Sequence, residues 1–333
     1  SEPVFDSLNP RPGAPETGGT LSVASFNFLN LFTTVDTGAS NCGPRQDDSC
    51  RGADSKVELR RQLDKTSAAL AMMDADIVGL TELENTASES VRMVVDAVNA
   101  RIGSDAYAYL DTGIIHEDAI KTGFIYQPST VEPIGDFALL NGRADPRFND
   151  SRNRPALAQS FRTLGNNAVL TVIVTHLRSK GSSCETDGDP NTGDGQGNCN
   201  RTRTSAAIAI ADWLATDPTD SGDPDFLVTG DLNAYTQEDP LRALQDAGLT
   251  NLIADGDQPY SFVFDKQAGA LDHALATKSL VPQVVAAMEW HINADEPPLY
   301  DYNLEHGRDP ALFDGDTPYR ASDHDPVIIG LQL

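Results

Sequence analysis

Several signals that would assign a broad class at once are missing from the 333 residues of the chain. No apolar run approaches the ~20 residues of a membrane-spanning helix, so we expect a soluble chain with no membrane partner. Neither a G-x-S-x-G segment nor a Walker loop is present, so neither a serine hydrolase of the nucleophile-elbow type nor a P-loop enzyme is indicated. No basic segment followed by an apolar one opens the chain, and Ser1 therefore resembles a mature or trimmed start.

Basic residues are scarce, since 24 Lys and Arg stand against 50 Asp and Glu and the formal net charge is −26. A strongly acidic surface repels a polyanion, which counts against nucleic acid as a partner. Two effects weaken that objection: an active-site cation inverts the local field, and salt screens repulsion beyond ~8 Å. We interpret the excess of acidic residues as a feature that keeps the protein soluble in a salty medium. We therefore expect its activity to persist at high salt. Seven basic residues are close in sequence to the polar segments described below: Arg152, Arg154, Arg162, Arg178, Lys180, Arg201 and Arg203.

Cysteine is also rare, with four residues in two close pairs, Cys42/Cys50 and Cys184/Cys199. The loops between the paired cysteines are rich in Gly, Asp, Asn and Pro. They bury too little apolar surface to keep a fixed conformation without a cross-link. A local disulfide across each would contribute about 2–3 kcal/mol, and an even count in close pairs favours an oxidising compartment. Zinc is the alternative, but neither pair has C-x-x-C spacing with matching His ligands.

The second of these loops contains DGDPNTGDG, which resembles a calcium-binding loop. Thr192 occupies the position where an EF-hand needs Gly, and no Glu closes the loop. We expect an exposed Asp-rich turn and keep a structural Ca²⁺ site of another type as the alternative.

Residues 1–20 are rich in Pro, Gly and Thr and are predicted to form an extended tail or linker, followed by a single domain over residues 21–333. Apolar spacing predicts helices at about residues 56–73, 88–101 and 203–214. Strands are predicted near residues 21–28, 74–80, 106–110, 122–126, 131–138, 156–161, 168–175, 225–228, 261–264, 270–276, 284–290 and 327–331. Hairpins mixed with β–α–β units indicate two facing mixed sheets with helices outside.

Polar side chains follow the apolar runs at the points where strands should end. They are Asn27 in SVASFNFLN, Glu82 in DADIVGLTELEN, Asp231 with Asn233 in FLVTGDLNAY, and Asp323 with His324 in RASDHDPVIIGL. Strand ends in layered α/β folds can converge on one cleft, and hard oxygen ligands with imidazoles suit a divalent cation and a phosphoester.

Each segment also has an ordinary structural explanation. Glu82 could be a solvated cap, and Asp231 with Asn233 could form an Asx turn. His324 could be a hydrogen-bonded core residue, but Asp272 in LDHAL is a suitable carboxylate to orient it. The neighbouring His273 should then point to the other face and be structural, while Asp325 should cap the turn before Pro326.

The segment THLRSKG brings His176 together with Arg178 and Lys180 at the end of a predicted strand. His176 could be a cap or a core residue, yet the basic residues beside it fit a phosphate-facing loop. Arg154 and Arg152 in SRNRPAL are further phosphate candidates, with surface solvation as a serious alternative for Arg152.

Taken in order, FNFLN, LTELEN, IKTGFIYQP, THLRSKG, GDLNAY, LDHAL and SDHDP resemble the endonuclease/exonuclease/phosphatase superfamily, which has the DNase-I-like fold. The segments NCGPRQDDSCRGADS, GDGQGNCN and MEWHINADEPP are similar to its secreted bacterial branch of large extracellular nucleases. The resemblance extends from about residue 20 to residue 333. It implies an α/β four-layer sandwich, two packed mixed β-sheets flanked by helices, and a phosphodiesterase that depends on Mg²⁺ or Mn²⁺.

Carried onto matching positions, the resemblance implies a role for each side chain. Glu82 and Asp323 would hold the metal with Asn27 close by, while Asp231 and Asn233 would position the attacking water and the phosphate. His324, oriented by Asp272, would act as general base or transition-state partner, and His176 would protonate the leaving oxygen or stabilise its charge. Asp118 could serve as a carboxylate partner of His176, and Arg154 and Arg178 would contact phosphate.

We therefore expect a secreted bacterial endonuclease, acting as a monomer, that hydrolyses DNA and also RNA with little sequence preference. No recognition helix or aromatic platform is visible, so contacts should be made mainly to phosphate and sugar. One rival is a superfamily phosphatase acting on phospholipids or small phosphate esters. Another is a secreted binding or matrix protein with a decayed site, although a decayed site should have lost some of these residues.

Overall fold

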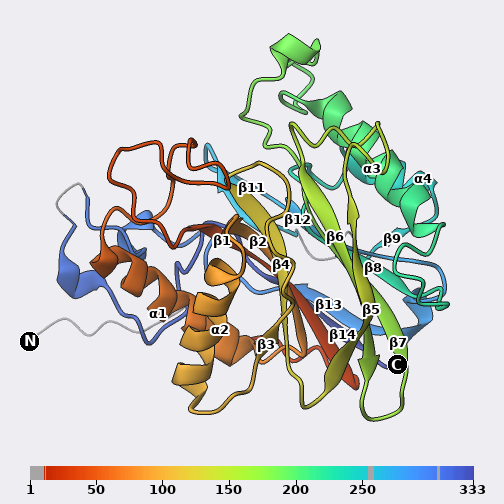
Figure 1. Cartoon of the computed structure of the whole chain (residues 1–333), viewed down its shortest axis with the longest axis horizontal. Helices are drawn as coiled ribbons and strands as arrows, with labels where there is room; N and C mark the ends of the chain where they lie inside the picture. The colour runs from red at the N-terminus through yellow and green to blue at the C-terminus, as the bar shows by residue number, and fades with distance from the viewer. Residues whose placement is uncertain (1–10, 12, 254–258, 306–307) are drawn as a thin grey trace, which may run out of the picture.

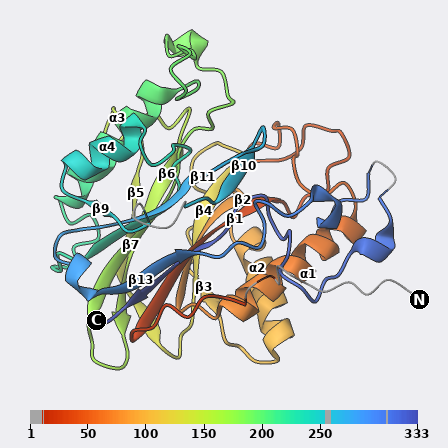
Figure 2. The ribbon, with the colours of Figure 1, turned by 180° about the vertical axis from the view of Figure 1, so that it is seen from behind.

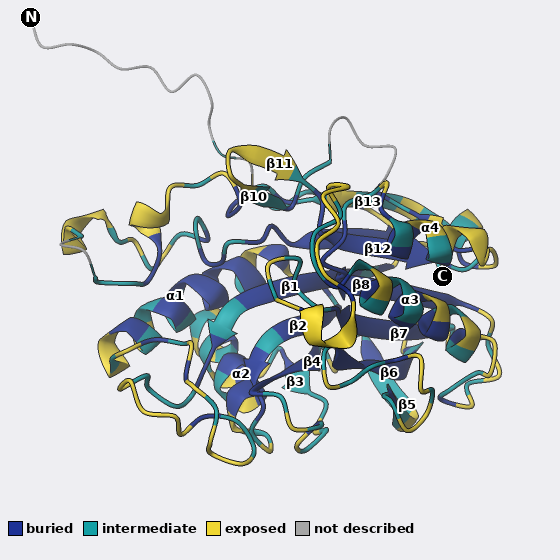
Figure 3. Cartoon of the chain, turned by 90° about the horizontal axis from the view of Figure 1, so that it is seen from above, coloured by how far each residue is buried: buried dark blue, intermediate teal, exposed yellow. Residues whose placement is uncertain are grey.

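The structure is a computed structural model that describes residue 11 and residues 13–253, 259–305 and 308–333. Two six-stranded sheets face one another, with helices on the outer face of each (Figures 1 and 2). Seen from above, helices α1 (Lys56–Met73) and α2 (Glu89–Ile102) lie outside one sheet, and α3 (Asn200–Leu214) and α4 (Asp239–Asp246) lie outside the other (Figure 3). The predicted four-layer sandwich of two packed mixed sheets is confirmed.

The first sheet contains both ends of the domain. In spatial order its strands are β13 (Val284–Glu289), β14 (Val327–Leu331), β1 (Leu21–Leu31), β2 (Ile77–Glu84), β4 (Ile120–Tyr126) and β3 (Ala108–Tyr109). Strands β1 and β2 are parallel and the other neighbours are antiparallel, which makes the sheet mixed.

The second sheet is built from the middle of the chain. Its order is β5 (Val131–Leu140), β6 (Arg154–Thr163), β7 (Val169–His176), β8 (Phe226–Asp231), β12 (Asp272–Ala276) and β9 (Thr250–Asn251). Strands β7 and β8 are parallel, and their connection carries helix α3 across the outer face. A two-stranded ribbon, β10 (Phe262–Phe264) with β11 (Gln267–Gly269), precedes β12.

The helices are α1 (Lys56–Met73), α2 (Glu89–Ile102), α3 (Asn200–Leu214) and α4 (Asp239–Asp246), with short 3₁₀ turns at residues 185–187, 281–283, 298–300 and 310–312. Helix α1 has the predicted bounds because the Ser55 side chain accepts a hydrogen bond from Glu58 N and Asp74 ends the helix in the left-handed conformation. Helix α4 and strands β9 and β11 were not predicted from the sequence, because each is too short for its apolar residues to show a helical or strand-like spacing.

The sheets are joined by apolar side chains that are fully buried between them. Phe124 of the first sheet contacts Phe161 of the second edge to face, with ring centroids 5.7 Å apart. Gly79 of β2 lies directly against Val174 of β7, where an added Cβ would come within 3.1 Å of the Val174 side chain. The two sheets are therefore held at a fixed, close separation, and side chains at their shared edge keep a fixed relation.

Both predicted disulfides are present, Cys42–Cys50 and Cys184–Cys199. Among the described residues, no helix is both long and apolar enough to cross a bilayer. Residues 1–10 and 12 of the predicted tail lie outside the described residues. The described part of that segment contacts the domain: Arg11 pairs with Asp295 and Glu296, and Thr20 N donates to Leu331 O at 2.7 Å.

Candidate active site

Four of the predicted side chains lie in one row across the second sheet. Arg154, the first residue of β6, is opposite His176, the last residue of β7. His176 is opposite Asp231, the last residue of β8, and Asp231 is opposite Asp272, the first residue of β12. Directly opposed residues on adjacent strands point to the same face, so this register brings the four side chains to one edge of the sheet.

The first sheet contributes polar groups from β1, β2 and the loop before β14. Strand β2 is irregular between Leu80 and Leu83, and Glu82 has φ of 62° there. A left-handed backbone on a residue other than glycine costs about 1–3 kcal/mol and persists only where its surroundings impose it. Glu82 Oε2 accepts a hydrogen bond from Asn30 N at 2.7 Å, which fixes the carboxylate in this conformation.

The Asp231 carboxylate is where the groups of the two sheets meet. Its Oδ2 is 3.4 Å from Asn27 Nδ2 of β1 and 3.1 Å from Asn233 Nδ2. The same oxygen is 3.5 Å from His176 Nε2 and 3.9 Å from His324 Nε2. Asp231 is 2% exposed, and burial raises the pKa of its carboxyl to about 7 against the opposing charge of His324. Asn233 is also held by its amide, which donates to Leu177 O at 3.1 Å.

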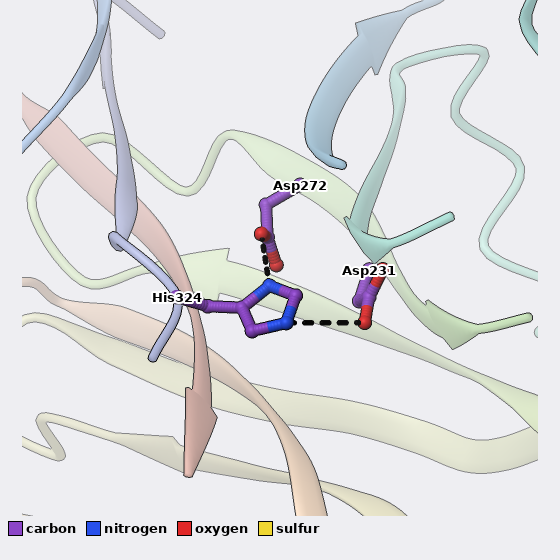
Figure 4. Close-up of side chains that lie close together, drawn as sticks. All are labelled: Asp231, Asp272 and His324. Carbon is purple, nitrogen blue, oxygen red and sulfur yellow. Dashed lines mark hydrogen bonds and ion pairs between the residues drawn. The ribbon is translucent and has the colours of Figure 1, made fainter. Parts of the chain in front are cut away.

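His324 is oriented by a carboxylate from the opposite sheet. Its Nδ1 lies 2.7 Å from Asp272 Oδ2, and its Nε2 is directed toward Asp231 (Figure 4). Asp272 is itself fixed by Ser261, whose hydroxyl donates to Asp272 Oδ2 at 2.7 Å. The ring of Phe262 covers the imidazole at a centroid distance of 4.6 Å. Burial by itself lowers the pKa of His324, but the charges of Asp272 and Asp231 outweigh it and hold the pKa well above its ordinary value.

His176 has the opposite electrostatic environment. Burial, followed by the charge of Arg154, lowers its pKa well below the ordinary value. Its Nε2 lies 3.5 Å from Arg154 Nη1 and 3.9 Å from Glu82 Oε1. Asp118, suggested from the sequence as its partner, instead lies 3.3 Å from Arg154 Nε and 3.6 Å from Arg51 Nη2. Asp118 therefore lies on the far side of Arg154 from His176. Arg154 is the residue that connects the two.

Glu82 and Asp323 are the two carboxylates available on the first-sheet side. Burial, followed by the negative charge of Asp323, raises the pKa of Glu82. Among the described residues, neither carboxylate pairs with a Lys or an Arg. Two carboxylates on the same side of the site, neither in an ion pair with Lys or Arg among the described residues, suit a divalent cation, and Asn27 offers a further oxygen.

A second group of potential ligands overlaps this region. One atom each of Asp231, Asp272 and His324 lies within 4.8 Å of the others. Two of those atoms already bind each other, since His324 Nδ1 and Asp272 Oδ2 form the hydrogen bond described above. We therefore regard this trio as a hydrogen-bonded chain and Glu82 with Asp323 as the better pair for a metal.

Other predicted residues have structural positions. Asp325 does not cap its own turn: its Oδ1 accepts from the backbone N of Ile292, Asn293 and Ala294 and so fixes a neighbouring loop. His273 points away from the site, as predicted, and its Nε2 contacts Ala234 O at 2.8 Å.

The seven basic residues that are close in sequence gather in space only in part. Arg154 and Arg178 line a pocket beside the site. The others have partners elsewhere: Arg162 pairs with Glu132, Lys180 with Glu238, Arg152 with Asp187, and Arg201 with Asp189. Arg203 is fully buried and donates to backbone carbonyls of residues 178, 196 and 198.

The acidic residues of the Cys184–Cys199 loop are used in local contacts. Asp189 accepts from Thr202 N and its hydroxyl at the start of α3, and Asp187 pairs with Arg152. Within the described parts of the chain, these carboxylates do not form a group of three that could hold a cation. The structure thus gives the Asp-rich turn a capping role and offers no support for Ca²⁺ in this loop.

Two residues near the site were missed from the sequence. Ser261 binds Asp272 across ten intervening residues, and no local pattern marks that contact. Arg51 directly follows Cys50 and could have been suspected, because the Cys42–Cys50 disulfide fixes its backbone next to Asp118.

Comparisons with known proteins place the chain among phosphoesterases. The profile described as Endonuclease/Exonuclease/phosphatase family matches residues 24–324. A search of curated proteins finds no match. Solved structures with the same fold include a mannosyl-6-phosphatase of Bacteroides thetaiotaomicron, which is 14% identical, with a TM-score of 0.56, over 94% of this chain and 100% of that one.

Two further structures have a similar degree of likeness. The human Nocturnin catalytic domain with a bound sulfate anion is 14% identical, with a TM-score of 0.52, over 93% of this chain and 92% of that one. D. rerio TDP2 complexed with a single-strand DNA product is 13% identical, with a TM-score of 0.54, over 93% and 97% respectively. At these identities the likeness establishes the fold alone.

Proposed function

The chain belongs to the endonuclease/exonuclease/phosphatase family, and from that premise we propose that it is a metal-dependent phosphodiesterase that cleaves DNA and RNA. The observation that carries the proposal is the convergence on Asp231 Oδ2. Two imidazoles and two amides from both sheets lie within 4 Å of this one buried oxygen. Such a cluster is suited to positioning a water and a phosphate and to moving protons between them.

Glu82 and Asp323 would hold Mg²⁺ or Mn²⁺, with Asn27 beside them. The donor set is made of hard oxygens, and burial, followed by the negative charge of Asp323, raises the pKa of Glu82. When bound, the cation would offset negative charge on the phosphoryl oxygens.

The remaining groups would divide the work of binding and proton transfer. Asp231 and Asn233 would orient the attacking water, because their side chains share one hydrogen bond and face the same space. His324, held by Asp272, would donate to a non-bridging phosphate oxygen. His176, beside Arg154, would interact with the leaving oxygen. In this scheme Asp272 and Ser261 position His324 and do not touch the substrate.

We also propose that the protein acts outside the cell, as a monomer of the secreted bacterial type. Two local disulfides support an oxidising environment. The net charge of −26 suits an enzyme that works in salt high enough to screen repulsion from its polyanionic substrate.

A phosphatase acting on small phosphate esters or phospholipids is the second candidate, and the likeness to a mannosyl-6-phosphatase favours it. The pocket beside the site favours a polynucleotide, since it extends beyond Arg154 and carries further arginines. A protein that merely binds would differ from both in showing no turnover.

The test is a digestion assay on plasmid DNA, single-stranded DNA and RNA with EDTA, Mg²⁺, Mn²⁺ and Ca²⁺ arms. Mannose 6-phosphate and phosphoinositide vesicles serve as the phosphatase arms. We expect nucleic acid cleavage with Mg²⁺ or Mn²⁺ and none with EDTA. Release of phosphate from the ester or lipid arms, with intact nucleic acid, would establish the second candidate instead. Asp246→Asn, an exposed change on α4, is the matched control for site variants.

A further inference from the structure

A pocket of about 560 Å³ opens next to the active site. It is walled by the Cys42–Cys50 loop, residues 116–119 ahead of β4, residues 150–154 and Arg178 after β7. Arg154 belongs to both spaces, because it lines the pocket while its Nη1 lies 3.5 Å from His176. The pocket is thus continuous with the part of the active site that contains Arg154 and His176.

We propose that this pocket is a second phosphate subsite, in which Arg178 and Arg51 bind the phosphate of the nucleotide adjacent to the scissile one. The proposal rests on the proposed function and deepens it, since it makes a polynucleotide strand, and not a small phosphate ester, the preferred substrate.

Arg178 is a half-buried cation whose guanidinium contacts no partner. Its Nε is fully buried and has no hydrogen-bond acceptor, and no ion pair involves its side chain among the described residues. The backbone is fixed on both sides: Arg178 N donates to Asn153 Oδ1 and Arg178 O accepts from Arg203, each at 3.0 Å. A buried donor without an acceptor is costly, and the Nη groups of the same guanidinium, which have no partner among the described residues, are the atoms that an anion in the pocket would contact.

Three of the four carboxylates that line the pocket have a partner. Glu117 pairs with Arg45 at 2.5 Å, and Asp150 accepts from Gly142 N at 2.9 Å. The Oδ2 of Asp48, in contrast, is buried and has no hydrogen-bond donor in the described part of the chain.

The last lining carboxylate, Asp118, is shared between two guanidiniums, at 3.3 Å from Arg154 and 3.6 Å from Arg51. Burial, followed by the positive charge of Arg154, lowers the pKa of Arg178, and the charge of Asp118 offsets this only in part. Four arginines and four carboxylates line the pocket, so an anion would be bound by the local placement of Arg178 and Arg51 and not by a net positive charge.

The Cys42–Cys50 loop holds Arg51 at the pocket. Both cysteines are buried in a small apolar cluster with Phe32, Ala119 and Ile120, so the loop is attached to β1 and to the start of β4. The Arg51 side chain is 41% exposed and lies over the Phe32 ring at 5.9 Å. The disulfide thus positions a cation that is free on one side to receive a ligand.

The pocket chemistry selects phosphate over a nucleobase. None of its lining residues is Phe, Tyr or Trp, and its one imidazole, that of His116, lies 3.7 Å from Asp150, so the wall lacks the large rings on which bases usually stack. Planar guanidiniums bind phosphate through two parallel hydrogen bonds. Recognition of the strand at this position would therefore be independent of sequence.

The test compares a substrate with one phosphate, thymidylyl-(3′→5′)-thymidine, with oligothymidylate, which supplies the adjacent phosphate. We expect Arg178→Gln to lower kcat/KM on oligothymidylate by about tenfold or more and on the dinucleoside by no more than about threefold. Arg51→Gln and the Cys42→Ser/Cys50→Ser pair should show the same selective loss, smaller in size. Arg162→Gln is the matched control and should change neither rate, because Arg162 lies at the opposite end of β6 from Arg154 and pairs with Glu132 of β5.

Equal losses on both substrates, or no loss on either, would overturn the subsite. If the wild-type protein cleaves neither substrate with Mg²⁺ or Mn²⁺, the proposed function itself fails. If it cleaves both at the same rate per bond, the phosphodiesterase stands and the subsite alone is refuted. Retained activity of each variant on the dinucleoside shows that it is folded.

Discussion

The two sheets contribute different chemistry to the shared edge. The first sheet supplies oxygen ligands on an irregular backbone: Asn27, Glu82 and Asp323 come from a strand, a bulge and a loop. The second supplies a regular row in which strand register alone aligns Arg154, His176, Asp231 and Asp272. In the function proposed above, the first sheet would bind the cation and the second would handle phosphate and protons. His324 joins the two, since it precedes β14 and binds Asp272.

The largest effect should come from removing the centre of the second-sheet row. Asp231→Asn keeps the shape but removes the charge around which both imidazoles are arranged. We expect kcat on DNA to fall by about 10³-fold with an unchanged melting temperature, while Asp246→Asn has no effect. Activity within a few-fold of wild type would break the assignment of this row.

Asp272→Asn tests a positioning residue on the same sheet. Loss of its charge weakens the orientation of His324 without touching substrate, so kcat should fall by about 10²-fold with little change in KM. The pH profile should also move, because His324 loses a charge that raises its pKa, and its protonated form should persist only to lower pH. A fall in kcat with an unmoved pH profile would indicate a merely structural residue.

Glu82→Gln and Asp323→Asn sharpen the comparison, since they belong to the first sheet. Each should raise the Mn²⁺ concentration needed for half-maximal activity by about 10–100-fold. Asp272→Asn should leave that concentration unchanged. If the Mn²⁺ concentration for half-maximal activity rose equally in first-sheet and second-sheet variants, the two sheets would not have separate roles.

Gly79→Val tests whether the two halves must be held at their present separation. Its Cβ would lie 3.1 Å from Val174 of the facing sheet, so the sheets must move apart. We expect a loss of about 1–3 kcal/mol in unfolding free energy by urea titration, with reduced activity. Gly165→Ala, which has open space around it, is the control and should leave both values unchanged.

The smallest effect concerns the loop that supports Asp323 and His324. Asp325 binds His291 Nδ1 at 3.0 Å; burial opposes protonation of His291, but this contact outweighs it and raises its pKa. Protonated His291 therefore stabilises the fold below pH ~6.5, and that stability is lost as pH rises through the raised pKa. Because about a third of the side chain is exposed, His291→Gln should cost about 0.5–1 kcal/mol at pH 5.5 and less at pH 8.5. An equal cost at both pH values would show that the charge contributes nothing.

The regular half of the site was easier to predict from sequence than the irregular half. His176 and Asp231 end long apolar runs, so strand patterning was enough to bring them to one edge. The conformation of Glu82 could not be read from its strand, because a bulge inside β2 sets it. Glu84, two residues on, turns instead to the backbone of Thr33 and Thr34.

Contacts between distant loops were beyond sequence reasoning. The binding of Ser261 to Asp272 and of Asp325 to residues 292–294 depends on how loops from different sheets pack. Charge clustering in sequence was also a poor guide, since Arg162 lies near Arg154 along the chain but at the opposite end of β6. Side-chain direction and loop packing, which have no local period, account for these differences.

The most direct test of the account is an anomalous difference map from crystals soaked in Mn²⁺. We predict a peak bound by Glu82 and Asp323, on the first-sheet side of Asp231. A peak enclosed by Asp231, Asp272 and His324, or none anywhere along this edge, would contradict the division of chemistry between the two sheets.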